Sequence, residues 1–246
     1  TQVRAIAEVA TAVIQGDLTR AIAVEARGEV QALKDTINQM ITNLRDTTRT
    51  AKEQDWLKTN LARFFGLMQG QRSLQALTDL VMSELTQAVG AQHGAFFLLE
   101  KNGEEELRLV STYAHLRRKQ LGSRFGVGEG LVGQSALERK PIVVTEVPEG
   151  YVQIGSGLGF APPRNIAVFP VLSEGQVRGV IEVASFHEFT PVQISFLEQL
   201  VLNVGLAINL IGTTTRTEEL LQQLKKSNVE LEQRRREIEE KAVLLE

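Results

Sequence analysis

Apolar residues recur at alternating steps of three and four positions between residues 30 and 68, which is the spacing of a helix with one apolar face. The first part of this pattern is formed by Val30, Leu33, Ile37, Met40 and Leu44. Two apolar positions per heptad are typical of a coiled coil, so we expect these side chains to form a dimer seam. The pattern resumes at Leu57, Leu61, Phe64 and Met68 in a different frame, which indicates a stutter near residues 47–54.

A shorter amphipathic helix is predicted over residues 3–14, followed by a polar connector with alternating apolar residues. The end of the helix, the connector and the start of the next helix are marked by Gly16, Asp17, Leu18, Ile22, Val24, Gly28 and Glu29. Glycine favours the left-handed residue that ends a helix, and a carboxylate is favoured near a helix N-terminus. Residues 1–50 therefore read as helix, extended connector and parallel helix. Two copies would bury their apolar faces in a four-helix bundle.

This arrangement resembles a HAMP domain, the parallel four-helix signal relay of bacterial receptors and sensor kinases. The resemblance rests on Gly16-Asp17-Leu18, on Ile22 and Val24, and on the helix start Gly28-Glu29-Val30. The proline often found early in the first helix of the family is absent. Either the sequence starts after that proline, or the unit belongs to a tandem array. An antiparallel helical hairpin is the alternative fold.

Residues 72–212 combine helical and strand patterns. Ser73 is a candidate N-cap for a helix that ends near Gly90. Asn102-Gly103 lies between two apolar runs and predicts a β-hairpin. A second hairpin is expected over residues 166–186, after a long loop at 148–165, and a helix is expected from Pro191 to Ile211. Helices at both ends of a mostly antiparallel sheet make an α+β domain.

The same block resembles a GAF domain, a small-molecule sensor fold. The resemblance is carried, in order, by residues 126–133, 141–144, 169–172 and 179–183, and by Phe189-Thr190. It implies an antiparallel sheet with flanking helices. We therefore expect an α+β protein in four parts: a HAMP-like half of a four-helix bundle at 1–50, a helical linker at 51–71, a GAF domain at 72–212 and a coiled-coil signalling helix at 213–246.

The predicted C-terminal helix has its own seam. Leu224, Leu231, Ile238 and Leu245 recur every seven residues, and three positions before each lie Leu221, Asn228, Arg235 and Ala242. An asparagine at the first of these heptad positions favours a two-stranded parallel coiled coil at a cost in stability. The helix would be about 50 Å long and needs a second copy to cover its apolar face. Its acidic and basic residues nearly balance, which argues against nucleic-acid binding.

Composition narrows the chemistry. The 246 residues contain no cysteine, which excludes disulfides, thiolate metal sites, cysteine nucleophiles and cysteine-linked chromophores. The net charge of −3 gives no clustered basic face for nucleic acid. No apolar run approaches the length of about 20 residues that spans a bilayer, and no signal peptide opens the chain. The first residue, Thr1, leads directly into a helical pattern, so we expect a fragment of a longer protein.

Residues 128–133 fit the dinucleotide-binding pattern G-x-G-x-x-G. The preceding residues make a poor parallel strand and the following helix is short, so a structural glycine-rich turn is the favoured interpretation. His93, His115 and His187 are scattered, and we predict no metal site. No nucleophile elbow or catalytic triad is present, so we predict no catalytic residues.

The resemblance to GAF domains implies a small-molecule pocket between the sheet and the 148–165 loop. Its candidate lining residues are Phe97, Tyr113, Phe125, Tyr151, Phe160 and Phe169, with a plain aromatic core as the alternative. Cyclic-nucleotide-binding members of the family carry an Asn-Lys…Phe…Asp-Glu pattern that residues 189–193 lack. Bilin-binding members usually attach their chromophore through cysteine. We predict no cofactor, and the identity of a small-molecule ligand stays open.

The order HAMP, GAF and signalling helix resembles the sensor and relay region of bacterial sensor histidine kinases, often hybrid ones. The resemblance implies a cytoplasmic two-component relay that is itself no enzyme. Its partner would be a second copy of the chain, with an output kinase domain further along the parent protein. Contact with the membrane would come only through upstream segments that anchor the parent in the inner membrane. The alternatives are a nucleotide-binding enzyme or sensor that uses residues 128–133, and an inert dimeric scaffold.

Overall fold

The computed structural model of the chain describes residues 2–114, 123–148, 150, 152–156 and 159–243. The helices are α1 (Gln2–Ile14), α2 (Glu29–Met68), α3 (Leu74–Ala88), α4 (Gly130–Glu138) and α5 (Pro191–Val243). The strands are β1 (His93–Asn102), β2 (Glu104–Tyr113), β3 (Arg124–Gly126), β4 (Ile142–Thr145), β5 (Ile154–Ser156), β6 (Gly159–Ala161), β7 (Asn165–Ser173) and β8 (Gln176–Ser185). The chain divides into two compact units, residues 1–60 and 61–246.

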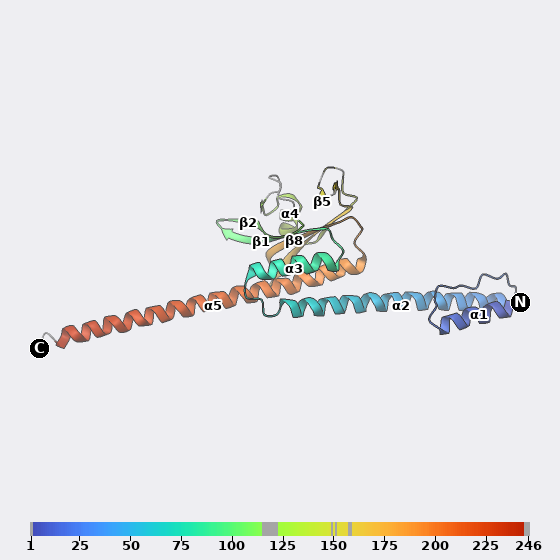
Figure 1. Ribbon diagram of the computed structural model, residues 1–246, viewed down its shortest axis with the longest axis horizontal. Coiled ribbons are helices and arrows are strands. Elements are labelled where there is room, and N and C mark those ends of the chain that lie inside the picture. The colour runs from blue at the N-terminus through green and yellow to red at the C-terminus, as the bar shows by residue number, and fades with distance from the viewer. Residues whose placement is uncertain (1, 115–122, 149, 151, 157–158, 244–246) are drawn as a thin grey trace. The chain divides into compact units, whose positions relative to one another are not determined.

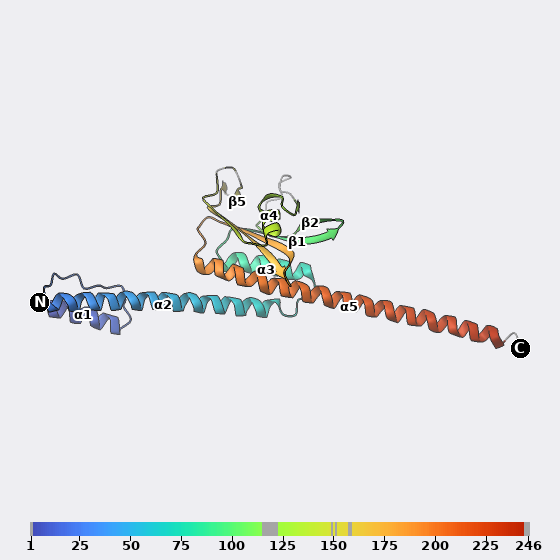
Figure 2. The same cartoon turned by 180° about the vertical axis from the view of Figure 1, so that it is seen from behind.

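In the first unit, α1 and the start of α2 run in the same direction, and the connector returns along their sides (Figures 1 and 2). Two hydrogen bonds are consistent with this parallel arrangement of the helices. Gln2, at the start of α1, donates to the carbonyl of Glu25 just before α2, and Arg45 of α2 donates to the Arg20 carbonyl at 3.1 Å. The parallel arrangement expected from the sequence is confirmed, and the antiparallel hairpin is excluded.

Side chains of α2 hold the connector through its backbone. The amide of Asn38 accepts a hydrogen bond from the Ile22 N–H at 2.8 Å and donates one to the Ile22 carbonyl at 3.1 Å. Gly16 takes φ +86°, a conformation that a glycine adopts without strain, where α1 ends. Asp17 then accepts from the hydroxyl and the N–H of Thr19, and these hydrogen bonds lower the pKa of the Asp17 carboxyl.

In the first unit, α2 has apolar residues on two sides, one buried within the chain and one exposed. Ile41 is only 1% exposed, and Ile6, Ala12 and Ile22 of the same unit are buried as well. The predicted seam residues point elsewhere, because Leu33, Met40 and Leu44 keep 50, 46 and 40% of their surface exposed. Val30 and Ile37 are half-buried. The seam prediction missed Ile41, although this residue of α2 is buried within its own chain.

The second unit is built on a six-stranded sheet in the order β3-β2-β1-β8-β7-β4, in which each described pairing is antiparallel. α3 and α5 cover one face, and α4 lies on the other with the small β5–β6 sheet (Figures 1 and 2). Ser73 caps α3 as expected, since its hydroxyl accepts from the Ala76 N–H at 3.1 Å. Gly103, at φ +110°, makes the turn of the predicted β1–β2 hairpin. This is the expected α+β architecture.

The last turns of α2 belong to the second unit. Phe64 is buried, with its ring edge-on to Phe196 of α5 at a centroid distance of 5.5 Å, and Met68 is buried as well. These two predicted seam residues therefore pack within their own chain. Their burial ties the end of the entering helix to the helical layer of the domain.

The backbone of α5 lies in direct contact with the backbone of the sheet. A β-carbon on Gly205 would stand 2.0 Å from the Leu172 carbonyl oxygen of β7, so the helix approaches β7 as closely as a glycine allows. Within the described residues, α5 is the one helix that is long and apolar enough, by length and composition, to cross a membrane. Its residues Phe196, Leu197 and Leu200 are fully buried, so this apolar character serves the core of the domain.

Candidate functional site

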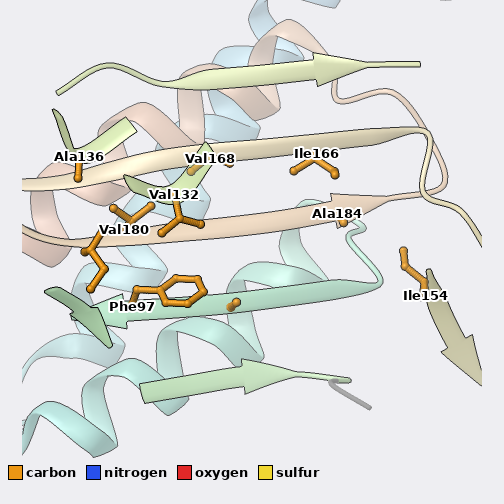
Figure 3. Close-up of a cluster of buried hydrophobic side chains, with 10 residues drawn as sticks. Phe97, Val132, Ala136, Ile154, Ile166, Val168, Val180 and Ala184 are labelled. Carbon is orange, nitrogen blue, oxygen red and sulfur yellow. The ribbon is translucent and has the colours of Figure 1, made fainter. Parts of the chain in front are cut away.

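The face of the sheet under α4 is an apolar layer and forms the first candidate site. Alternate residues of neighbouring strands point to this face, as the pleat of a strand requires. Figure 3 shows Val132 of α4 and Val180 together at one end of the face, and Ile166, Ala184 and Ile154 at the other. We call this layer the α4 face. Its buried members are Ala95, Phe97, Leu107, Val132, Ala136, Ile154, Ile166, Val168, Val180 and Ala184.

Two of the six predicted pocket aromatics lie on the α4 face. Phe97 is buried in it, and Phe125 packs edge-on against Phe97 at a centroid distance of 5.5 Å. Phe160 is on the small β6 strand and is exposed. Tyr151 lies outside the described residues.

The expectation that Tyr113 and Phe169 line the pocket is wrong. Tyr113 shares its face with Ser111, whose hydroxyl donates to Asp79 of α3 at 2.6 Å, so it lies on the face that α3 covers. Phe169 alternates with Val168 of the α4 face and pairs with Ile181, and it too faces the helical layer. Both residues stabilise the side of the sheet away from α4.

Glu182 is a polar residue of the α4 face that the sequence analysis missed. It lies on β8 between Val180 and Ala184, which are both members of that face, and is half-buried. Burial raises the pKa of the Glu182 carboxyl to about 7. The available signal was the strand 179–183, in which one carboxylate interrupts an otherwise apolar run. Because helices cover both faces of the sheet, a charged residue in this strand must face either the α4 side or the side of α3 and α5.

The glycine-rich segment 126–133 closes on itself before α4. The Glu129 carboxylate accepts a hydrogen bond from the Gly126 N–H at 2.8 Å, and the Gly128 N–H donates to the Gly133 carbonyl at 2.8 Å. A β-carbon on Gly133 would stand 2.2 Å from the Gly126 carbonyl oxygen. β3, which precedes the loop, pairs antiparallel with β2, so the βαβ unit of a dinucleotide site is missing from the described sheet. These contacts support the structural interpretation of the glycines.

An exposed apolar groove on the helical side forms the second candidate site. Leu206 and Leu210 of α5, 61 and 67% exposed, line it together with Phe65 and Met68 at the end of α2. Leu210 stands 14 and 21 positions before Leu224 and Leu231, so it occupies the same place in the heptad. We call the apolar line through these three residues the α5 seam.

The other predicted seam residues of the C-terminal helix are less fully described. Leu224, Asn228 and Leu231 are all exposed in the single chain. Ile238 lies in α5, but its side chain is not described, and Leu245 lies outside the described residues. Among the described residues, no group of three or more His, Cys, Asp or Glu side chains could hold a metal ion.

Comparison with known families and structures identifies both parts of the chain. A family model described as the GAF domain matches residues 71–209, more than half of the chain, and a HAMP domain model matches residues 1–46. The GAF domain of a phosphoenolpyruvate-protein phosphotransferase from Coxiella burnetii is 20% identical, with a TM-score of 0.54, over 65% of this chain and 96% of that chain. The corresponding domain from Acinetobacter is 16% identical, with a TM-score of 0.53, over 67% and 98%.

A free methionine-R-sulfoxide reductase from Neisseria meningitidis, solved with its substrate, is 20% identical with a TM-score of 0.52, over 63% of this chain and 89% of that chain. At these identities the structures show a shared fold, which agrees with the curled antiparallel sheet and its flanking helices. HAMP and GAF domains are signalling and sensor modules rather than catalytic ones. The chain thus belongs to the GAF domain family, carries a HAMP domain ahead of its GAF domain, and is a sensory signalling region.

Proposed function

We propose that this chain is the cytoplasmic sensor and relay segment of a two-component sensor histidine kinase, and that it works as a parallel homodimer. The order of HAMP domain, GAF domain and long exit helix supports this proposal, because it is the order of a relay between an upstream receptor and a downstream output domain. The kinase domain and the membrane anchor would belong to other parts of the parent protein.

The observation that carries the dimer is the uncovered apolar surface of the helices. The α5 seam stays in one heptad frame from the GAF domain to the exposed part of the helix, and Leu33, Met40 and Leu44 are similarly uncovered on α2. Side chains in this pattern are buried when a second parallel helix supplies the matching positions. The dimer would therefore be held both before and after the GAF domain.

The contacts between sheet and exit helix provide a route for the signal. Arg178 of β8 donates a hydrogen bond to Asn209 of α5 at 3.1 Å, next to a break in the β7–β8 register. Gly205 touches the backbone of β7 one turn earlier. A ligand on the α4 face that changes the sheet would therefore act on α5 through β7 and β8. It would shift the relay only by its difference in affinity for the two states.

Disulfide cross-linking tests the dimer, and the absence of cysteine from the chain makes single-cysteine variants unambiguous. We expect Leu231→Cys and Leu44→Cys to form interchain disulfides on mild oxidation, since equivalent seam positions meet across a parallel dimer. Gln233→Cys, on the outer side of the same helix, is the matched control and should stay monomeric on a non-reducing gel. Equal cross-linking of Leu231→Cys and Gln233→Cys, or none at either, would contradict the proposal.

The histidine kinase assignment has its own test. The coding sequence downstream of residue 246 should encode a helix with a phosphoacceptor histidine and an ATP-binding domain. A different output domain there would leave the dimeric relay in place and remove the kinase from the proposal.

A further inference from the structure

A cavity of about 350 Å³ lies at one end of the α4 face, where α4, the β1–β2 hairpin and the start of β8 meet. Figure 3 shows Ala136, which also lines this cavity, at the opposite end of the face from Ile154 of the 148–165 loop, where the sequence predicted a pocket. Ligand pockets of this volume hold small molecules. We call this space the hairpin cavity, and the residues that give it its chemistry are Leu99, Glu105, Leu137, Arg139, Gln176 and Val177.

The hairpin cavity combines apolar surface with two charged groups. Leu137 is 57% exposed, and Leu99 and Val177 are half-buried. We call these three side chains the apolar wall of the cavity. Glu105 and Arg139 are exposed at the same cavity. A molecule bound there would therefore contact accessible apolar side chains as well as charged ones.

The two charged residues come from separate elements and do not pair with each other. Glu105 lies on β2, and Arg139 directly follows α4. Within the described part of the chain, the Arg139 guanidinium has no hydrogen-bond or ion-pair partner. Glu105 already interacts with another group of the chain, but a carboxylate has about four acceptor positions and can accept from a further donor. The hairpin cavity thus presents an unpaired cation and a carboxylate to the same space.

The end of α4 does not explain why Arg139 is an arginine. Arg139 is the C-cap of the helix and adopts φ +55°, a left-handed conformation that glycine adopts without the steric cost that arginine has. Residues held in such conformations cluster at binding and active sites. A role for the guanidinium in binding would account for this residue.

The hairpin cavity also lies beside the connection to the exit helix. Val177 lines the cavity, and the next residue, Arg178, donates a hydrogen bond to Asn209 of α5 at 3.1 Å. The register of β7 with β8 is irregular here, between Val171 and Leu172. A ligand that holds the start of β8 would therefore act directly on the residue that contacts α5.

We propose that the hairpin cavity binds a small zwitterion, with its carboxylate on Arg139, its ammonium group on Glu105 and a short apolar body on the apolar wall. Charge-assisted hydrogen bonds would hold both ends of such a ligand. A simple anion meets the Glu105 carboxylate and a simple cation meets the guanidinium, so one of the two residues repels any ligand with a single charge. This inference rests on the proposed sensing function, because it names the class of signal that the GAF domain detects.

Calorimetric titration of the whole 246-residue chain with three matched probes tests the inference. L-Leucine is the zwitterion, 4-methylpentanoate lacks its ammonium group and 3-methylbutylamine lacks its carboxylate. At neutral pH, L-leucine should bind saturably and about three- to fivefold more tightly than either of the other probes, the range expected for charge pairs that solvent partly screens. No saturable binding of L-leucine, or equal binding of the three probes, would overturn the inference.

Single substitutions show which charge recognises which end of the ligand. Arg139→Gln should remove the preference for L-leucine over the amine, and Glu105→Gln should remove the preference over the acid. A purely structural role would change the binding of all three probes equally, and that result would refute the assignment. Arg72→Gln and Glu146→Gln remove exposed charges elsewhere in the domain and are the matched controls. Gln176→Trp keeps both charges but fills the cavity, so a variant that still unfolds cooperatively should not bind L-leucine; binding that survives would exclude this cavity as the site.

Two further measurements separate this inference from the proposed relay. Hydrogen exchange at residues 205–213 of α5 should change on saturation with L-leucine in the wild type and stay unchanged in Arg178→Gln. Binding without that change, or without cross-linking of Leu231→Cys, refutes the relay and leaves the ligand class standing. A cross-linked dimer that does not bind L-leucine refutes the ligand class and leaves the relay standing.

Discussion

Replacing Glu182 with glutamine should stabilise the folded protein above neutral pH. A carboxyl whose pKa is higher in the folded chain than in the unfolded chain holds its proton more tightly when folded. Its ionisation therefore destabilises the fold progressively as the pH rises from 4.5, the ordinary value, and completely above about 7. Glutamine has nearly the same shape and carries no charge at any pH.

The interval between those two pKa values sets the magnitude. It corresponds to an upper bound of about 3 kcal/mol, since each pH unit is worth about 1.4 kcal/mol. It is an upper bound because Glu182 is only half-buried and solvent screens part of the effect. For a chain of this size, a gain of about 3 kcal/mol raises the midpoint of unfolding by about 6–12 °C.

Differential scanning calorimetry over a pH series provides the assay. At pH 8 the GAF domain of Glu182→Gln should unfold at a higher temperature than the wild type, and the two curves should converge near pH 4.5. Glu198→Gln should follow the wild type throughout, because Glu198 is exposed on α5. A glutamine variant that is less stable at pH 8, or a difference that does not change with pH, would refute the reasoning.

Three further predictions concern packing and hydrogen bonding. Gly205→Ala should lower the free energy of unfolding by about 1–3 kcal/mol, because its β-carbon would meet the Leu172 carbonyl oxygen. Gly212→Ala is the control, because its β-carbon meets open space, and it should stabilise the helix by about 0.5–1 kcal/mol; calorimetry measures both. Asn38→Leu should cost about 1–3 kcal/mol, because it removes both hydrogen bonds to the Ile22 backbone, and hydrogen exchange at Ile22 should rise while the GAF domain is unaffected. Phe64→Ala should cost about 3–5 kcal/mol of GAF domain stability, measured by urea unfolding, since the ring is buried against Phe196; a loss under 1 kcal/mol would contradict that packing.

The sequence alone predicted the elements that local chemistry determines. Ser73 capped its helix, Gly103 turned its hairpin, and the connector residues produced the parallel helices of the HAMP domain. Each of these features depends on residues close together in the chain. The order of the GAF motifs then identified the fold.

The faces of the sheet were harder to predict, because the sheet is covered on both sides. Phe169 lies in a strand that is apolar at nearly each position, so its sequence does not distinguish the α4 face from the helical layer. Tyr113 comes after a register break between β1 and β2. Glu182 could not be predicted from the aromatic residues that suggested a pocket, because it is a carboxylate on a strand that is otherwise apolar. On α2, the heptad pattern predicts Met40 and Leu44 as seam residues but does not include Ile41. Ile41 is buried and lies on a second apolar side of the same helix.

The pairing of Asn38 with the Ile22 backbone limits how the first unit can move. α2 is joined to the connector at Ile22 by two hydrogen bonds and at Arg20 by Arg45, and Ile41 of α2 is buried. Turning α2 about its own axis would break these links together. α2 and the connector of one chain should therefore move as a single rigid piece, so that movement takes place by sliding or tilting against the other copy.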